Sequence, residues 1–219
     1  MKFLEYPMLA VFFLSAGIHL YASLKQDKPL RNRTKPFILL GLLGFYLGAA
    51  EPIVLTVVFA LVFSWIGDVL LIPKGTKWFT AGGIAFMVSH VFFIVSYAKE
   101  TDFAKIPAAL PVLLPLAFAA VSLFLFSKLR PHLPKTLFYP MLLYLLLNGA
   151  MNCFAWFRAY TVGGAAGIIT AVGALLFFIS DSSLFFVRFN KDSRLKTHFV
   201  VMLTYSLGEF LIILGLIMR

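Results

Sequence analysis

Long apolar runs alternate along the chain with short polar connections. Runs of about twenty apolar residues are long enough to cross a bilayer as helices, and short runs of alternating polarity, typical of membrane strands, do not recur. We therefore predict an all-α bundle of eight transmembrane helices, at residues 6–24, 36–50, 53–72, 79–98, 107–127, 137–157, 163–186 and 198–218. Because the connections are short, consecutive helices should pack antiparallel in one domain spanning residues 1–219.

The composition supports this assignment to integral membrane proteins. Of the 219 residues, 61% are hydrophobic and only 13% are charged, which is incompatible with a water-soluble globule. A net charge of +10 would suggest nucleic-acid binding in a soluble protein. Here the charge lies in short loops, where it indicates membrane topology and contact with anionic headgroups. We therefore predict membrane lipids, and no nucleic acid, as partners.

Basic residues divide unevenly between the two sides of the predicted bundle. Fourteen lie in the loops after the first, third, fifth and seventh spans, whereas the termini and the other loops hold five, namely Lys2, Lys99, Lys105, Arg158 and Arg219. Cytoplasmic loops of membrane proteins are enriched in Lys and Arg. We therefore predict both termini outside and the basic loops in the cytoplasm, in a multi-pass protein of a bacterial inner membrane.

Two carboxylates lie inside apolar runs. Asp68 follows Gly67 in the third predicted span, and Asp181 follows Ser180 in the seventh. A charged group at the bilayer centre costs roughly 2.5 to 3.5 kcal/mol, so each is a candidate for a functional site. Both spans run toward the cytoplasm, and we predict that the two carboxylates meet in one water-accessible hollow near that surface. The shared pattern also fits a parallel duplication of a four-helix unit.

Other polar residues recur at helical spacing. Tyr144, Asn148 and Asn152 are four residues apart in the sixth span, as are Tyr205 and Glu209 in the eighth. Such faces should turn toward each other or a wet cavity, since the bilayer core offers no water. Interhelical hydrogen bonding is the simplest interpretation of mid-span Asn and Tyr. The span at 107–127 has almost no polar side chains and is the best candidate for a lipid-facing helix.

Several catalytic chemistries lack their sequence patterns. The chain has no His-x-x-x-His or Glu-x-x-His pair for a metal, no Gly-x-Ser-x-Gly and only one cysteine, Cys153. An embedded acid pair suited to general acid and base catalysis remains, with Lys35 as the plausible ion-pair partner from another helix. The alternative is a proton-coupled transporter or channel that uses the same carboxylates, for which broken helices and an inverted repeat are expected.

An ordered set of short motifs covers nearly the whole chain: Thr34-Lys35-Pro36, Gly67-Asp68, Ser89-His90, Tyr144, Gly173-Ala174 with Ser180-Asp181, and Tyr205 with Gly208-Glu209-Phe210. This set resembles the YhhN-type lysoplasmalogenase family. The resemblance implies a hydrolase that cleaves the vinyl ether bond of a lysoplasmalogen into a fatty aldehyde and glycerophosphoethanolamine or glycerophosphocholine. No cofactor or metal would be needed. Position 209 departs from the family, in which Gln or His is more common.

The implied reaction fits the acid pair. Acid hydrolysis of a vinyl ether protonates carbon, passes through an oxocarbenium-like cation and then adds water, so two carboxylates can divide the work as in glycoside cleavage. We assign the acid to Asp181, which has apolar neighbours in sequence, and the stabilising carboxylate to Asp68. The residues assigned to substrate binding are Lys35, His90, Tyr144, Asn148, Tyr205 and Glu209. Headgroup preference and oligomeric state stay open at this point.

Overall fold

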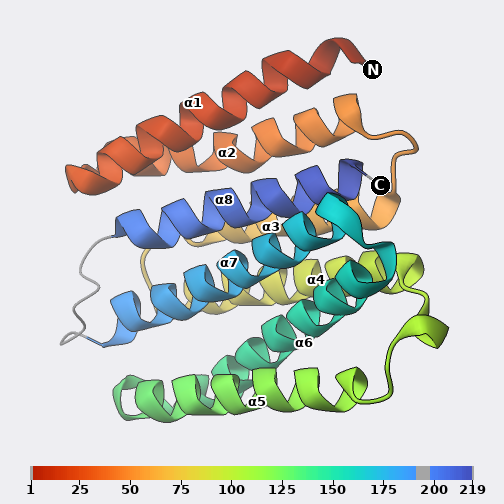
Figure 1. Cartoon of the computed structure of the whole chain (residues 1–219). Coiled ribbons are helices and arrows are strands. Elements are labelled where there is room, and N and C mark those ends of the chain that lie inside the picture. Colours follow the sequence, from red (N-terminus) through yellow and green to blue (C-terminus); the bar gives the residue numbers. More distant parts are fainter. Residues whose placement is uncertain (1, 191–197, 219) are drawn as a thin grey trace. The chain divides into compact units, whose positions relative to one another are not determined.

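A computed structural model describes residues 2–190 and 198–218, and every regular element in this part of the chain is helical (Figure 1). The α-helices are α1 (Glu5–Leu24), α2 (Lys28–Ala49), α3 (Leu55–Leu70), α4 (Thr76–Glu100), α5 (Leu110–Leu129), α6 (Phe138–Val162), α7 (Gly164–Phe189) and α8 (His198–Ile217). Short 3-10 helices lie at Lys2–Leu4, Phe103–Lys105, Arg130–His132 and Lys135–Leu137. The predicted all-α fold is confirmed. Lys191, Arg194, Lys196 and Arg219, which entered the charge count, lie outside the described residues.

Six of these helices are long and apolar enough to cross a membrane: α1, α4, α5, α6, α7 and α8. The protein is therefore a multi-pass membrane protein. The two other predicted spans are shorter in their apolar part. Helix α3 has only 16 residues, about 24 Å of helix rise against a hydrocarbon core of about 30 Å. Helix α2 carries basic side chains through its first two turns.

The predicted start of the second span is wrong as a helix boundary. Helix α2 begins at Lys28 instead of residue 36, because Asp27 caps it: Asp27 Oδ1 accepts a hydrogen bond of 3.0 Å from the Leu30 amide. Pro29 in the first turn also favours helix initiation. Hydropathy detects only the apolar part of a helix, so the charged turns before Pro36 were assigned to a loop.

The predicted end of the sixth span, residue 157, is also wrong. Helix α6 continues to Val162, and Gly163 terminates it. The φ of Gly163 is 70°, a value that residues with a side chain rarely adopt. Arg158, assigned from the sequence to an external loop, is therefore a helical residue. Its side chain is fully buried.

The chain divides into two compact units, Met1–Ser96 and Tyr97–Arg219, and α4 begins in the first and ends in the second. In the first unit, α1 packs against the glycine face of α2. A Cβ added to Gly41 would lie 2.6 Å from the Phe12 amide nitrogen, and one added to Gly48 would lie 2.6 Å from that of Glu5. Only glycine permits this backbone approach. A duplication of a four-helix unit stays a prediction.

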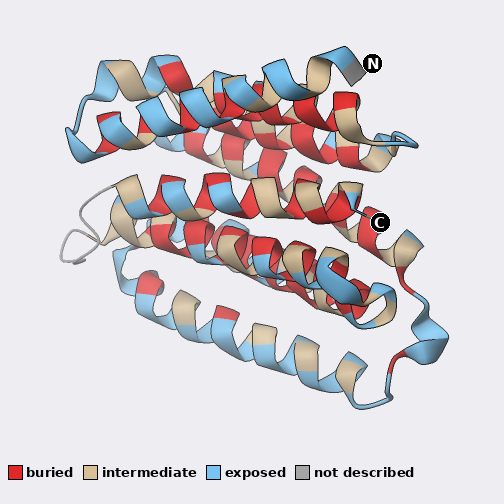
Figure 2. Cartoon of the chain, turned by 45° about the horizontal axis from the view of Figure 1, so that its top comes forward, coloured by how far each residue is buried: buried red, intermediate tan, exposed pale blue. Residues whose placement is uncertain are grey.

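In the second unit, α7 and α8 lie side by side (Figure 1). Their backbones meet at Gly173 and Gly208, where a Cβ on Gly173 would lie 2.6 Å from the Ile212 amide nitrogen. Helix α5 is largely exposed (Figure 2), and only Ser122 and Leu129 among its residues are buried. Its exposed side chains are mostly apolar, as predicted for a helix that faces lipid.

Candidate active site

Asp68 is a buried carboxylate with a cationic partner in the first unit. It lies on α3, near the last residue Leu70, and only 2% of its side chain is exposed. Lys35 Nζ, on α2, lies 3.1 Å from Asp68 Oδ1. The ion pair predicted for Lys35 is thereby confirmed. An ammonium group at this distance favours the ionised carboxylate and offsets part of the cost of burying it.

The three residues Thr34-Lys35-Pro36 each contact a different side chain of a neighbouring helix. Thr34 Oγ1 lies 3.0 Å from Nδ1 of His19 on α1. The indole nitrogen of Trp65, one turn before Asp68 on α3, donates a hydrogen bond of 3.0 Å to the Pro36 carbonyl. Lys35 is therefore held on both sides by interhelical hydrogen bonds. These contacts position its ammonium group at Asp68.

Asp181 lies in the second unit and has polar neighbours of a different kind. It is 5% exposed on α7. The Tyr144 hydroxyl donates to Asp181 Oδ2 at 2.5 Å, and Asn148 Nδ2 donates to the same oxygen at 2.9 Å. Both donors come from the polar face predicted for the sixth span. The prediction that Tyr144 and Asn148 share one face of this helix is confirmed. Oδ2 of Asp181 therefore accepts two hydrogen bonds from α6.

The remaining predicted site residues are all buried. The Tyr205 ring on α8 lies 5.5 Å from the ring of Phe177, one turn before Asp181. Glu209, also on α8, is fully buried and lies within electrostatic range of Tyr97. His90 is fully buried on α4, in the first unit. The structure thus joins Lys35 to Asp68, and Tyr144 and Asn148 to Asp181; a meeting of Asp68 with Asp181 stays a prediction.

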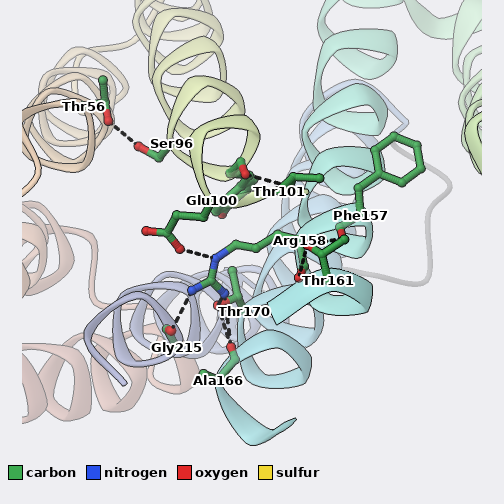
Figure 3. Close-up of polar contacts among 11 residues, drawn as sticks. Thr56, Ser96, Glu100, Thr101, Phe157, Arg158, Thr161, Ala166, Thr170 and Gly215 are labelled. Carbon is green, nitrogen blue, oxygen red and sulfur yellow. Dashed lines mark hydrogen bonds and ion pairs between the residues drawn. The ribbon is translucent and has the colours of Figure 1, made fainter. Parts of the chain in front are cut away.

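A second polar cluster, which the sequence analysis missed, surrounds Arg158 (Figure 3). Its Nε donates to Glu100 Oε2 at 2.6 Å, its Nη1 donates to Thr170 Oγ1 at 2.9 Å, and its Nη2 donates to the Gly215 carbonyl at 3.2 Å. A further bond of 3.3 Å reaches the Ala166 carbonyl. We call these five residues the Arg158 cluster. It joins the C-terminal ends of α4 and α8 to α6 and the start of α7.

The sequence did contain a signal for this cluster. Apolar residues continue past Arg158 as far as Val162, and the first strong helix terminator is Gly163. A search for helix ends would have placed Arg158 inside a helix, where a charged side chain needs a partner. Hydropathy alone cannot separate a buried Arg from a loop Arg.

Residues 30–216 match the sequence profile of the YhhN family. The chain belongs to this family. Among curated proteins, a lysoplasmalogenase of Homo sapiens, TMEM86A, is 28% identical over 181 residues, which cover 78% of this chain and 71% of the human protein. Lysoplasmalogenase TMEM86A of Bos taurus is 27% identical over 182 residues, 82% of this chain and 71% of the bovine protein. No solved structure matches.

The region shared with the YhhN family contains both carboxylates and every predicted binding residue, from Lys35 to Glu209. It also contains Glu100 and Arg158. His19, which supports Thr34, lies before it. Among the described residues, no group of three or more His, Cys, Asp or Glu side chains is placed to hold a metal ion.

Proposed function

We propose that this YhhN-family protein is a lysoplasmalogenase, a membrane-embedded hydrolase that cleaves the vinyl ether bond of a lysoplasmalogen. The products are a fatty aldehyde and glycerophosphoethanolamine or glycerophosphocholine. Two supports are the family membership and the two relatives that are named lysoplasmalogenase. The observation that carries the proposal is a pair of buried carboxylates, each with a built polar setting: Asp68 lies beside the ammonium group of Lys35, and Asp181 accepts hydrogen bonds from Tyr144 and Asn148.

This contrast assigns the two acid–base roles. A cation 3.1 Å away holds Asp68 ionised, which suits it to stabilise a positive charge and to orient water. Two of the donors on Asp181 are a phenol and an amide, which carry no charge, and burial inside the protein favours the neutral acid. Asp181 is therefore the general acid. Acid–base sites typically contain two titratable groups whose environments give them different pKa values, so that one is protonated while the other is ionised.

The reaction then proceeds in three steps. Asp181 transfers a proton to the vinyl carbon remote from the ether oxygen; we assign this proton to Oδ1, because Oδ2 accepts the hydrogen bonds of Tyr144 and Asn148. The other vinyl carbon becomes an oxocarbenium-like cation, whose stabilisation we assign to the Asp68 carboxylate. Water adds to this carbon and gives up a proton, which restores the acid. The resulting hemiacetal breaks its bond to the glycerol oxygen, releasing the aldehyde and the glycerol hydroxyl. A general acid in such a position contributes about 10² to 10⁴ in rate.

The lysophospholipid would enter from the membrane. We propose that its hydrocarbon chain lies between helices and that Tyr205 and Glu209 contact it; His90 stays a predicted binding residue of the first unit. Lys35 would bind the phosphate while it holds Asp68. From the excess of Lys and Arg in the loops after the first, third, fifth and seventh predicted spans, we propose that the headgroup and the active site face the cytoplasmic side of a bacterial inner membrane.

Replacement of each carboxylate by its isosteric amide tests the mechanism. Purified D181N and D68N are assayed for aldehyde release from a lysoplasmalogen, and we expect each rate to fall by about 10² to 10⁴ while the helical content is unchanged. D102N is the matched control, because Asp102 precedes α5 and 47% of its side chain is exposed. A parent protein that releases no aldehyde, or amide variants that keep the parent rate, would refute the proposal.

Thiol labelling tests the orientation in C153A, which removes the natural cysteine. Lys74 lies in the connection after α3, and Asp102 in the connection after α4. In intact cells, an impermeant maleimide should label D102C, whereas K74C should react only after the membrane is permeabilised. Labelling in the opposite order would reverse the proposed topology.

A further inference from the structure

Asn152 is a third polar residue on the face of α6 that reaches Asp181. It is fully buried, one helical turn beyond Asn148. Its Nδ2 donates to the Asn148 backbone oxygen at 3.0 Å and to Asn148 Oδ1 at 3.3 Å. Its own Oδ1 is buried and has no hydrogen-bond partner among the described residues. A buried acceptor without a hydrogen bond lowers the stability of the folded state, so the presence of Asn152 at this position needs an explanation.

The direction of these hydrogen bonds is fixed by the carboxylate. Asp181 Oδ2 is an acceptor, so Asn148 must turn its NH₂ group toward it and its oxygen away. The oxygen of Asn148 then faces Asn152, which must present its own NH₂ group. The reversed amide of Asn152 would place an oxygen against two acceptors. The hydrogen bonds therefore run in one direction: Asn152 donates to Asn148, and Asn148 donates to Asp181.

We propose that Asn152 is a positioning residue for Asp181, acting through the side-chain amide of Asn148. It holds the Asn148 NH₂ group on Oδ2, which leaves Oδ1 as the oxygen that carries the proton. Serial hydrogen bonds also polarise one another, so the donor on Asp181 is strengthened. The catalytic consequence rests on the proposed function, whereas the coupling of the three side chains does not.

Two substitutions separate the contacts of Asn152. N152A removes both hydrogen bonds to Asn148. In N152S, the hydroxyl can still donate to the backbone oxygen four residues earlier but cannot reach the Asn148 side chain. C153A is the matched control, because Cys153 is the next residue on the helix and packs in an apolar cluster with Ile106 and Phe157.

Infrared spectroscopy during a pH titration reports the coupling without catalysis. The carboxylic acid band of Asp181 is the one that D181N lacks. We expect this band to persist to higher pH in N152A, N152S and N148A, because each weakens the donors that stabilise the ionised form. The double variant N148A/N152A should match N148A, since Asn152 acts through Asn148. C153A should titrate like the parent.

Kinetics supply the second measurement. N152A and N152S should lower kcat by about threefold to tenfold, the contribution of one neutral hydrogen bond, and leave KM unchanged because Asn152 does not touch the substrate. The alkaline limb of the pH–rate profile should move to higher pH. A variant whose only defect is in packing would lower thermal stability without moving this limb.

Three results would overturn the positioning role: a parent-like Asp181 band in folded N152S, a shift in the double variant equal to the sum of the single shifts, or no band that D181N removes. N152S decides the matter if N152A does not fold. Loss of the proposed function is a separate outcome. If the parent releases no aldehyde but the band shifts as described, the positioning role stands and the lysoplasmalogenase proposal fails.

Discussion

Two buried polar clusters join α6 to α7, and they differ in how charge is compensated. In the Arg158 cluster, a guanidinium group meets a carboxylate, a hydroxyl and backbone carbonyls. In the other, Asp181 accepts two hydrogen bonds from Tyr144 and Asn148, which are neutral. On α6, Arg158 follows Asn148 by about 15 Å of helix, given 1.5 Å of rise per residue. The contacts of Arg158 thus include an opposite charge, whereas the two hydrogen bonds on Asp181 Oδ2 come from neutral groups.

The largest expected effect is on stability, at the Arg158 cluster. E100Q leaves the Arg158 charge buried without its carboxylate, so the free energy of unfolding should fall by about 3 kcal/mol. Tryptophan fluorescence during denaturation in detergent measures this loss. Aldehyde release per folded molecule should stay within about twofold of the parent, because the reacting groups are untouched. A variant as stable as the parent would remove the distinction between the clusters.

A double replacement sharpens the same test. In E100L/R158M, both charges are removed and no ion remains buried alone. Its stability should therefore exceed that of E100Q, since paired buried charges can often be replaced by apolar side chains at little cost. If the double variant is the less stable of the two, the hydrogen bonds of Arg158 to Thr170 and Gly215 outweigh the ion pair.

The next effect is on activity, at the Asp181 cluster. Y144F removes the donor at 2.5 Å and keeps the ring that packs on Phe185. We expect kcat to fall by about tenfold to a hundredfold, the range for a hydrogen bond to a charged group, because Asp181 becomes a carboxylate as it gives up its proton. Stability should change by less than about 1 kcal/mol. Y139F, at an exposed tyrosine on the same helix, is the control.

Helix spacing gives a third, smaller effect. In G173A, the added methyl would lie 2.6 Å from the Ile212 amide nitrogen, so α7 and α8 must separate, at a cost of about 1 to 3 kcal/mol. G17A is the control, because nothing lies within 4 Å of the position of its Cβ. It should be neutral or slightly stabilising. Equal melting temperatures for the two variants would contradict the close approach.

The smallest effect concerns a surface ion pair outside the spans. A hydrogen bond from Lys105 is the main reason why the pKa of Asp102 lies below its usual value. A carboxyl group with a lowered pKa stabilises the folded state above its unfolded pKa, and this contribution is lost as the pH falls through the folded pKa. D102N should therefore have a slightly lower melting temperature than the parent at pH 7, and this difference should vanish as the pH falls through the folded pKa of Asp102. A difference that grows toward acid pH would contradict this assignment.

Local patterns in the sequence determined much of the site. Apolar runs located the helices, and the four-residue spacing of Tyr144 and Asn148 placed both on the face that contacts Asp181. The absence of a cation near Asp68 on its own helix pointed to Lys35 as its partner. These inferences succeeded because helical periodicity is a property of the chain itself.

Only the tertiary structure decided where Arg158 lies and which groups surround it. Its partners Glu100 and Gly215 are 58 and 57 residues away along the chain. Whether a charged side chain is buried depends on partners brought by other helices, which no local hydropathy window contains. The same holds for Asp181, since the packing of α6 on α7 selects the oxygen that accepts the hydrogen bonds of Tyr144 and Asn148.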